Sequence, residues 1–323
     1  MRVLFVSSGI NGNKPSPIIL TQGESLKKYG IKLDYFTINE KRLKGYIKEG
    51  VRLYRYLRLN NYDIIHAHYG LSAIVALLAK NSNKLVVSFM GDDLLGANRI
   101  DGSITKLSRL LAFINSLMAK YIYDYSVVKS KEMLNKLNTN NVSIIPNGVN
   151  VDMFKSKDKA KSRDHLNLNN RDKIILFVSN PSRVEKNYSL ASNAVKKVNI
   201  PECYLLVVSN RLQEELVYYY NASDLVILTS FHEGSPNVIK EAMACNRPIV
   251  STNIGDVEWV LGGTEGCYIS NYNTEEYSKK IKLALKFSEE KGRTNGRNRI
   301  LELGLDAETT ALKIIDVYKK VIN

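Results

Sequence analysis

Residues 230–246 read SFHEGSPNVIKEAMACN and lie between two short apolar runs, 225–228 (LVIL) and 248–251 (PIVS). Continuous apolar runs of this length are typical of strands buried in a parallel sheet. Loop-forming residues come first in the quoted segment, and 238–244 follow with the composition of the first turns of a helix. The segment therefore predicts a strand, a loop, a helix and a second strand, which together are the repeating unit of an α/β fold.

Two carboxylates, Glu233 and Glu241, bracket this loop and the start of its helix. A loop between a parallel strand and a helix lies at the carboxyl end of the sheet, where open α/β sheets bind their ligands. Gly234 and Pro236 favour a loop that exposes backbone N–H groups at a helix N-terminus, and such groups suit a phosphate or a row of sugar hydroxyls. We therefore expect a ligand site here.

The same alternation of strand and helix runs along the rest of the chain. Strands are expected at 2–9, 32–38, 63–68, 84–89, 125–128, 142–145, 173–179 and 204–209, and helices at 18–29, 41–59, 71–79, 104–121, 131–137, 188–198, 214–220, 275–287 and 307–321. The pattern predicts the α/β class, with two Rossmann-like, doubly wound parallel-sheet domains facing across a cleft. We expect an N-terminal domain at 1–160, a C-terminal domain at 161–305 and a helical segment at 306–323, with the charged run 155–164 as a solvated linker.

The composition is that of an ordinary soluble globular protein, with 323 residues, 44% hydrophobic and 24% charged. Its three cysteines lack the spacing of a metal or redox site, which indicates reduced thiols in the cytoplasm. No segment has the pattern of a secretory signal or the roughly 20 apolar residues that span a membrane. We therefore expect a cytoplasmic location.

The net charge of +14 is concentrated in the first half, where residues 1–160 hold 24 basic and 12 acidic side chains. A basic half predicts an anionic partner such as a membrane surface, a nucleic acid or an acidic substrate, and a solvated Lys-rich surface is the alternative. No nucleic-acid-binding motif is present, so we expect no nucleic-acid partner. The helix expected at 41–59 either lies against anionic lipid on the inner face of the membrane or is simply solvated; its cations are Lys41, Arg42, Lys44, Lys48, Arg52, Arg55 and Arg58.

Three further motifs join the opening segment in a recognisable order. They are DIIHAH at 63–68, IPNGV at 145–149 and SRVEK at 182–186. With Glu233 and Glu241 as an E-x₇-E pair, the chain resembles the retaining glycosyltransferases of family 4, which have the GT-B fold. The resemblance runs from about residue 2 to about residue 320. It implies an enzyme that moves a sugar, a hexose or a related one, from a nucleotide-diphosphate-sugar to a lipid-linked or polysaccharide acceptor of cell-surface glycan synthesis.

Arg183 and Lys186 lie on one loop after the strand expected at 173–179. Arginine binds phosphate bidentately and lysine binds it as a point charge, so the pair would stabilise a departing nucleoside diphosphate without a metal ion. A solvated charged loop is the alternative, since Glu185 lies between them. We expect no metal site and no cofactor.

The resemblance assigns the remaining site residues. Glu233 would accept hydrogen bonds from the donor sugar, Glu241 would bind the ribose, and His68 would point toward the transferred sugar. Asp93 would touch the acceptor or brace its loop, whereas His66 is expected to face the other side as a core or capping residue. The other donor-binding residues would be Gly9, Ser209, Asn210, Arg211, Gly234, Ser235, Pro236, Asn237 and Val238. Transfer would proceed on one face of the sugar, with the donor's own phosphate helping to deprotonate the acceptor.

The sequence also departs from the family pattern. Met90 stands where many members have a histidine, and the segment between Asn210 and Tyr218 is short, so the identity of the base stays open. The helix expected at 307–321 would cross back to the N-terminal domain and act as a hinge. Two other functions remain open: a non-catalytic, transferase-like partner subunit, and a sugar-nucleotide epimerase of the same fold.

Overall fold

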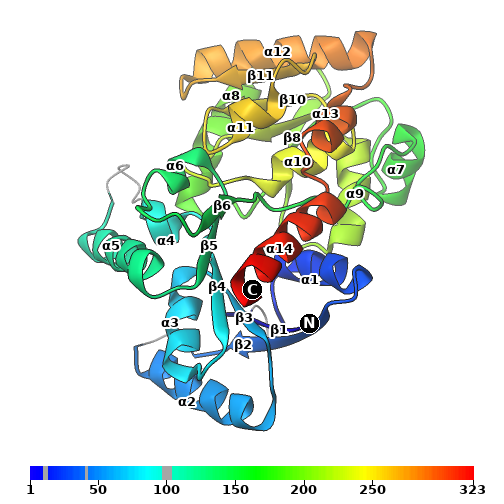
Figure 1. Ribbon diagram of the computed structural model, residues 1–323. Coiled ribbons are helices and arrows are strands. Elements are labelled where there is room, and N and C mark those ends of the chain that lie inside the picture. The colour runs from blue at the N-terminus through cyan, green and yellow to red at the C-terminus, as the bar shows by residue number, and fades with distance from the viewer. Residues whose placement is uncertain (10–13, 41–42, 97–103) are drawn as a thin grey trace. The chain divides into compact units, whose positions relative to one another are not determined.

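The computed structural model describes residues 1–9, 14–40, 43–96 and 104–323 and divides into two compact units (Figure 1). The first unit holds the described residues between Met1 and Gly148 together with the C-terminal helix α14 (Ala307–Ile322). The second unit holds Val149–Asp306. The expected cations Lys41 and Arg42 lie outside the described residues.

The first unit is built on a six-stranded, all-parallel sheet in the order β2-β1-β3-β4-β5-β6. Its strands are β1 (Arg2–Ser8), β2 (Lys32–Ile38), β3 (Ile64–His68), β4 (Lys84–Ser88), β5 (Tyr125–Val128) and β6 (Val142–Ile144). This is the flavodoxin-like order of doubly wound sheets, in which the chain changes direction between β1 and β3. Ligands of such sheets bind at that switch point, beyond the carboxyl ends of the two strands.

Helices cover both faces of this sheet. Five helices of the described chain contribute to the core on one face; they are α2 (Leu43–Leu59), α3 (Gly70–Ala79), α4 (Asp92–Leu95), α5 (Lys106–Tyr121) and α6 (Lys131–Leu134). The other face packs against α1 (Pro17–Lys28) and α14. His66 Nδ1 lies 2.6 Å from the Tyr318 hydroxyl, so a buried polar contact also ties α14 to this sheet.

The second unit repeats the plan with five parallel strands in the order β11-β10-β9-β7-β8. The strands are β7 (Lys173–Val178), β8 (Cys203–Val208), β9 (Leu225–Leu228), β10 (Ile249–Thr252) and β11 (Cys267–Ser270). Their order is again flavodoxin-like, so the switch point lies between β7 and β9. One face packs against α8 (Tyr188–Val198) and α12 (Thr274–Glu290), and the other against α9 (Gln213–Ala222), α10 (Asn237–Ala244), α11 (Val257–Leu261) and α13 (Gly296–Glu302).

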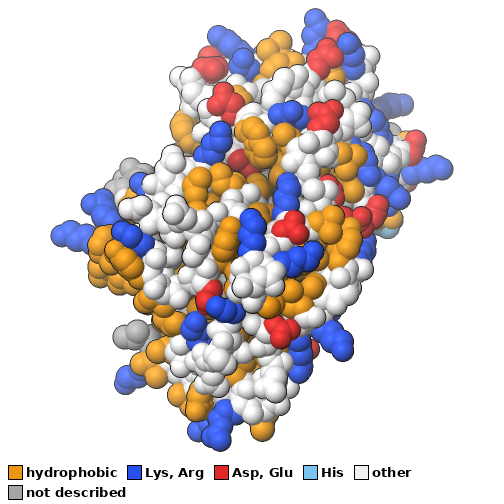
Figure 2. Space-filling view, viewed as in Figure 1, with side chains coloured by type: hydrophobic (Ala, Val, Ile, Leu, Met, Phe, Trp, Pro, Cys, Tyr) orange, Lys and Arg blue, Asp and Glu red, His pale blue; other side chains and the backbone are white. Residues whose placement is uncertain are grey.

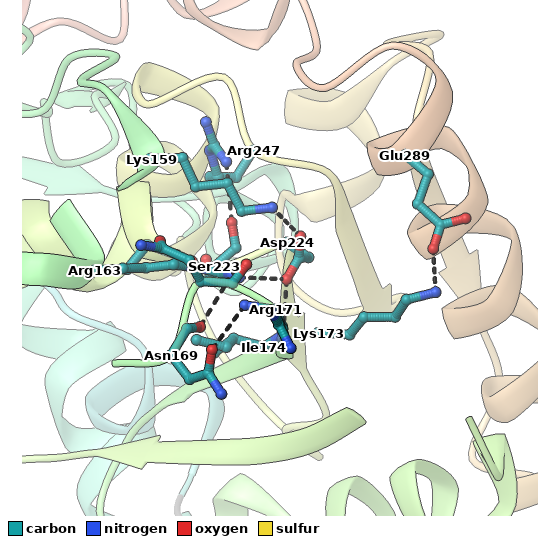
Figure 3. A network of polar contacts seen from close by, with 12 residues as sticks. Lys159, Arg163, Asn169, Arg171, Lys173, Ile174, Ser223, Asp224, Arg247 and Glu289 are labelled. Atoms are coloured by element: carbon teal, nitrogen blue, oxygen red, sulfur yellow. Dashed lines mark hydrogen bonds and ion pairs between the residues drawn. The ribbon is translucent and has the colours of Figure 1, made fainter. Parts of the chain in front are cut away.

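The charged run 155–164 is mostly exposed, as predicted, but it is not a plain linker, because it enters a helix with a buried arginine. Its second half begins the helix α7 (Lys159–His165), in which Arg163 is only 2% exposed. Arg163 Nη2 donates to Asp224 Oδ2 at 2.9 Å, and its Nε donates to the carbonyl of Ala222 at 2.9 Å. In Figure 3, dashed lines join Asp224 to both Arg163 and Lys159, the two cations with which it forms ion pairs. Arg163 can be buried because its guanidinium finds a carboxylate and backbone carbonyls.

Among the described residues, no helix is both long enough and apolar enough to cross a bilayer.

Candidate functional site

The switch point of the second sheet brings together two of the residues predicted to act on a ligand. Lys186 ends the short 3₁₀ helix η1 (Val184–Lys186) after β7, and Glu233 lies in the loop after β9. The two form an ion pair, with side chains that are 15% and 19% exposed. Ser230 Oγ also donates to Glu233 Oε1 at 3.0 Å. The carboxylate is therefore held at the carboxyl edge of the sheet by a cation and a hydroxyl.

Arg183 directly precedes η1 in the same loop and lines a small pocket. Its Nε donates to Glu185 Oε1 at 2.6 Å, and its side chain is 57% exposed, so the alternative of a solvated charged loop is not removed by these contacts. The pocket has a volume of about 280 Å³ at the carboxyl ends of β7 and β8. It is lined by Val178, Ser179, Asn180, Arg183, Val208, Ser209, Asn210, Arg211 and Leu216. The structure thus places the predicted base-side residues and the predicted phosphate-binding arginine around one pocket.

The loop that follows Glu233 is packed tightly against the loop after β10. Gly255 has φ +55°, and a Cβ added there would lie 2.5 Å from the carbonyl oxygen of Gly234. Only glycine permits both this conformation and this close backbone approach. Gly234, Ser235 and Pro236 are buried, and α10 starts directly after them at Asn237. The first backbone N–H groups of α10 have no partner within the helix and are the natural donors to an anion.

A buried chain of polar contacts fixes this loop and was missed at the sequence level. Ser235 Oγ donates to Asp256 Oδ2 at 2.5 Å, and Lys240 Nζ donates to Ser235 Oγ at 2.9 Å. Burial lowers the pKa of Lys240 to about 8 and raises that of Asp256. Asp256 follows Gly255 beyond a neighbouring parallel strand, and that position at the carboxyl edge is the signal that would have suggested it.

Glu241 is buried in α10, so it is not the exposed helix residue that was the alternative to a binding role. Tyr220 of α9 donates its hydroxyl to Glu241 Oε2 at 2.7 Å. Burial raises the pKa of the Glu241 carboxyl, and the Tyr220 hydrogen bond opposes that rise. Nearby, no donor among the described residues reaches the buried Asn237 Oδ1, so this acceptor is unsatisfied in the described part of the chain.

In the first unit, His68 ends β3 at the switch point of its sheet, with Gly9 directly after the neighbouring β1. Its ring is buried against Phe5 at 4.4 Å between centroids, and neither ring nitrogen has a hydrogen-bond partner among the described residues. Burial lowers the pKa of His68 well below its ordinary value, so the imidazole is neutral near pH 7. The loop beyond Gly9 includes residues 10–13, which lie outside the described part of the chain.

The expectation that His66 faces the opposite side from His68 is wrong. The two rings are stacked with centroids 4.4 Å apart, because residues two apart on a strand share a face. His66 is nevertheless a core residue, as expected: its Nδ1 contacts Tyr318 and its Nε2 lies 2.8 Å from Ser88 Oγ. Burial lowers the pKa of His66 to about 3.

Asp93 braces its own loop. Its carboxylate accepts backbone hydrogen bonds from Gly70 at 3.0 Å and from Met90 and Gly91 at 2.9 Å each. The side chain is buried, and burial raises its pKa to about 6. These contacts are those of a residue that braces its loop, which was one of the two predicted roles. The other role, a direct contact with an acceptor, stays a prediction.

Two sequence families match the chain, one on each unit. Residues 19–153 match the family described as Glycosyltransferase Family 4, and residues 172–286 match the family described as Glycosyl transferases group 1. Both ranges fall on the parallel-sheet domains, and the switch-point residues Lys186 and Glu233 lie in the second. The matches agree with the resemblance that the motifs predicted.

Similar proteins are known from bacteria. The chain is 24% identical over 230 residues to N-acetyl-alpha-D-glucosaminyl L-malate synthase of Bacillus anthracis. The aligned region covers 62% of this chain and 59% of that protein. The chain is 25% identical over 345 residues to N,N'-diacetylbacillosaminyl-diphospho-undecaprenol alpha-1,3-N-acetylgalactosaminyltransferase of Campylobacter jejuni. That alignment covers 94% of this chain and 91% of the relative. The chain thus spans about three fifths of the first relative's length and most of the second's.

The solved structure of Anabaena Alr3699/HepE in complex with UDP and glucose has the same fold. It superposes with a TM-score of 0.78 at 17% sequence identity and covers 99% of both chains. The predicted fold class, two doubly wound parallel-sheet domains of the GT-B type, is confirmed.

Proposed function

The chain belongs by its two family matches and its fold to the GT-B glycosyltransferases, and we propose that it transfers a sugar from a nucleotide-diphosphate-sugar with retention of anomeric configuration. The observation that carries this proposal is the switch-point cluster of the second unit. Lys186 and Glu233 are paired there, and Arg183 lines the adjoining pocket. A cationic loop beside a carboxylate is the chemistry that a diphosphate joined to a sugar requires.

The donor's parts would divide among these residues. The diphosphate lies against Arg183, Lys186 and the N-terminus of α10, where the dipole of the helix favours negative charge. Glu233 accepts hydrogen bonds from the sugar hydroxyls, and Glu241 accepts them from the ribose diol. The base occupies the pocket edge formed by Ser209, Asn210 and Arg211. UDP is the first nucleotide to test, since it is the one bound in the HepE structure.

Both cations of the loop have carboxylate partners before any donor binds. Arg183 pairs with Glu185, and Lys186 pairs with Glu233. A diphosphate would take over the Arg183 contact, because it carries two negative charges in all and offers several acceptor oxygens to a guanidinium. Lys186 would then bridge the leaving phosphate and Glu233. This places a positive charge where negative charge grows as the sugar–oxygen bond breaks.

The reaction we propose uses no protein nucleophile. The bond between the anomeric carbon and the phosphate oxygen breaks, the acceptor oxygen bonds to the same face of that carbon, and the acceptor's proton passes to the departing phosphate oxygen. Neutral His68, whose ring nitrogens are unpartnered among the described residues, would hydrogen-bond the transferred sugar. The cationic charge comes from Arg183 and Lys186, so we propose that no metal ion is needed.

We propose a lipid-linked or polysaccharide acceptor of cell-surface glycan synthesis and a cytoplasmic enzyme at the inner face of the membrane. The Campylobacter relative's name contains a diphospho-undecaprenol-linked acceptor, which supports this class. The basic first half of the chain supports an anionic surface as a partner.

Thermal shift against UDP, GDP, ADP and their sugar conjugates tests the donor site. At least one should raise the melting temperature of the wild type, and Lys186→Ala should lose most of that rise while Lys282→Ala, an exposed lysine of α12, keeps it. If no nucleotide stabilises the wild type, the enzyme proposal is overturned. The anomeric configuration of the transferred sugar, measured by NMR, then distinguishes retention from inversion. If no sugar is transferred but the sugar of the nucleotide is converted to its epimer, the protein is an epimerase.

A further inference from the structure

The helix α5 exposes the apolar face that its sequence pattern would be expected to bury. Its large outward side chains are between 42% and 71% exposed; they are Leu107, Leu110, Phe113, Leu117 and Tyr121. The buried positions of this helix are instead Asn115 and Ala119. Single exposed apolar residues are common on soluble proteins, but a stripe of five on one helix is the kind of patch that marks an interaction site.

The stripe is continuous along the helix. Its members recur at intervals of three and four residues, so they share one side, and the span from Leu107 to Tyr121 is about 21 Å at the rise of an α-helix. Figure 2 shows the apolar side chains over α5 bordered by Lys and Arg side chains. The exposed cations of the helix are Lys106, Arg109 and Lys120, and its sequence contains no acidic residue.

Helix α2 lies in the same helical layer, separated from α5 by α3 and α4, and has the same character on its outward face. Ile47, Val51 and Tyr54 are exposed there and recur with helical spacing, while Leu53 and Leu57 face the core. Exposed cations stand among them; they are Lys44, Lys48, Arg52, Arg55 and Arg58. The one carboxylate of α2, Glu49, is 4% exposed and pairs with Arg52. Helix α3, which packs against α2 in the same layer, contains no acidic residue and exposes Leu78.

We propose that the outward face of α5 docks on an anionic lipid bilayer with its five apolar side chains inserted among the headgroups, and that the cations of α2, in the same helical layer, add to the attraction. An amphipathic helix with a cationic border lies in the membrane interface plane, and each cation near an anionic surface adds to the attraction. A second copy of this chain is the other candidate occupant. Charge argues against it, because a two-fold contact along α5 would place two sets of cations against each other, and α5 itself carries no carboxylate to offset them.

Vesicle co-sedimentation tests the proposal with the full chain. Wild type should bind vesicles of phosphatidylcholine mixed with phosphatidylglycerol more strongly than vesicles of phosphatidylcholine alone. The double variant Leu110→Gln/Phe113→Gln should lower the partition coefficient by about tenfold or more, since burying each such side chain is worth well over a factor of ten when complete. Glutamine is a good helix former, so α5 should keep its structure, and an unchanged melting temperature verifies this.

A matched control and a charge arm complete the experiment. Leu283→Gln/Leu301→Gln removes two comparably exposed leucines from the second unit and should leave vesicle binding unchanged. Lys106→Gln/Arg109→Gln should weaken binding about fivefold per charge on anionic vesicles and little on neutral ones. The proposal is overturned if the wild type does not bind anionic vesicles. It is also overturned if light scattering shows that the wild type is a dimer and that Leu110→Gln/Phe113→Gln is a monomer. Neither result would contradict the proposed nucleotide site, because thermal shift with UDP tests that site in the absence of a membrane.

Discussion

Lys186 Nζ and Glu233 Oε1 form an ion pair between the loops that follow two neighbouring strands, β7 and β9. Ser230 Oγ donates to the same carboxylate oxygen, and the Lys186 carbonyl accepts a hydrogen bond from Thr229 Oγ1 at 2.8 Å. The Glu233 carboxylate is therefore held by Ser230 as well as by Lys186, and Thr229 fixes the backbone of Lys186. A cation fixed in this way costs no reorganisation when charge develops on a leaving group.

Lys186→Ala should lower kcat by about 10²- to 10³-fold, the usual cost of removing one preorganised charge-stabilising group. Glu233→Gln keeps the size of the side chain and removes its charge, so it should raise KM for the donor while Lys186 is left with a weaker partner. Steady-state kinetics with the nucleotide sugar identified by thermal shift measures both. A Lys186→Ala enzyme with unchanged kcat would show that this cation acts only in the structure.

Tyr220→Phe should weaken nucleotide binding about tenfold, because the variant leaves the buried Glu241 carboxylate without the hydroxyl that supports its charge. Titration calorimetry with the nucleoside diphosphate measures this. Tyr219→Phe, on the same helix, is the control and should bind as wild type does. Loss of thermal stability in Tyr220→Phe with full nucleotide affinity would remove Glu241 from the binding site.

Arg163→Met should destabilise the second unit by about 3–5 kcal/mol, since it leaves the largely buried Asp224 without one of its two cations. Trp259 is the only tryptophan of the chain and lies in α11 of that unit, so its fluorescence during urea unfolding reports the transition. Arg171→Met removes an exposed arginine from the same unit and should shift the midpoint little. Equal midpoints for the two variants would mean that the Arg163 pair adds no stability.

The sequence predicted most strands because each is a short apolar run, and β2, β5 and β9 match the expected ranges residue for residue. The strand β11 was missed, since Cys267–Ser270 is short and mixes apolar with polar residues. The pairing of Lys186 with Glu233 depends on β7 lying beside β9. The local sequence of a strand does not predict which other strand it will pair with, so this ion pair could not be predicted. Asp256 reaches Ser235 from the loop after the neighbouring strand β10, so only its position at the carboxyl edge of the sheet, and no local motif, could have suggested it.

His66 should make the protein less stable in mild acid. Its pKa is about 3 in the folded chain and about 6.5 when unfolded, so the unfolded state binds more protons between these values. The stability that neutral His66 provides is therefore complete above pH 6.5 and is lost as the pH falls toward 3. Asp93 acts in the opposite sense, because its raised pKa of about 6 lets the folded state bind a proton first.

A comparison of variants isolates the His66 contribution from that of Asp93. His66→Asn cannot titrate, so between pH 7.5 and pH 5 the wild type should lose about 2 kcal/mol more unfolding free energy than the variant does. His165→Asn is the control, since His165 is exposed and stacks on Tyr218, and it should follow the wild type. Urea unfolding followed by circular dichroism at the two pH values gives these differences. Parallel pH dependence in wild type and His66→Asn would mean that the pKa of His66 is the same folded and unfolded, so that at pH 5 its contacts with Tyr318 and Ser88 belong to an imidazolium.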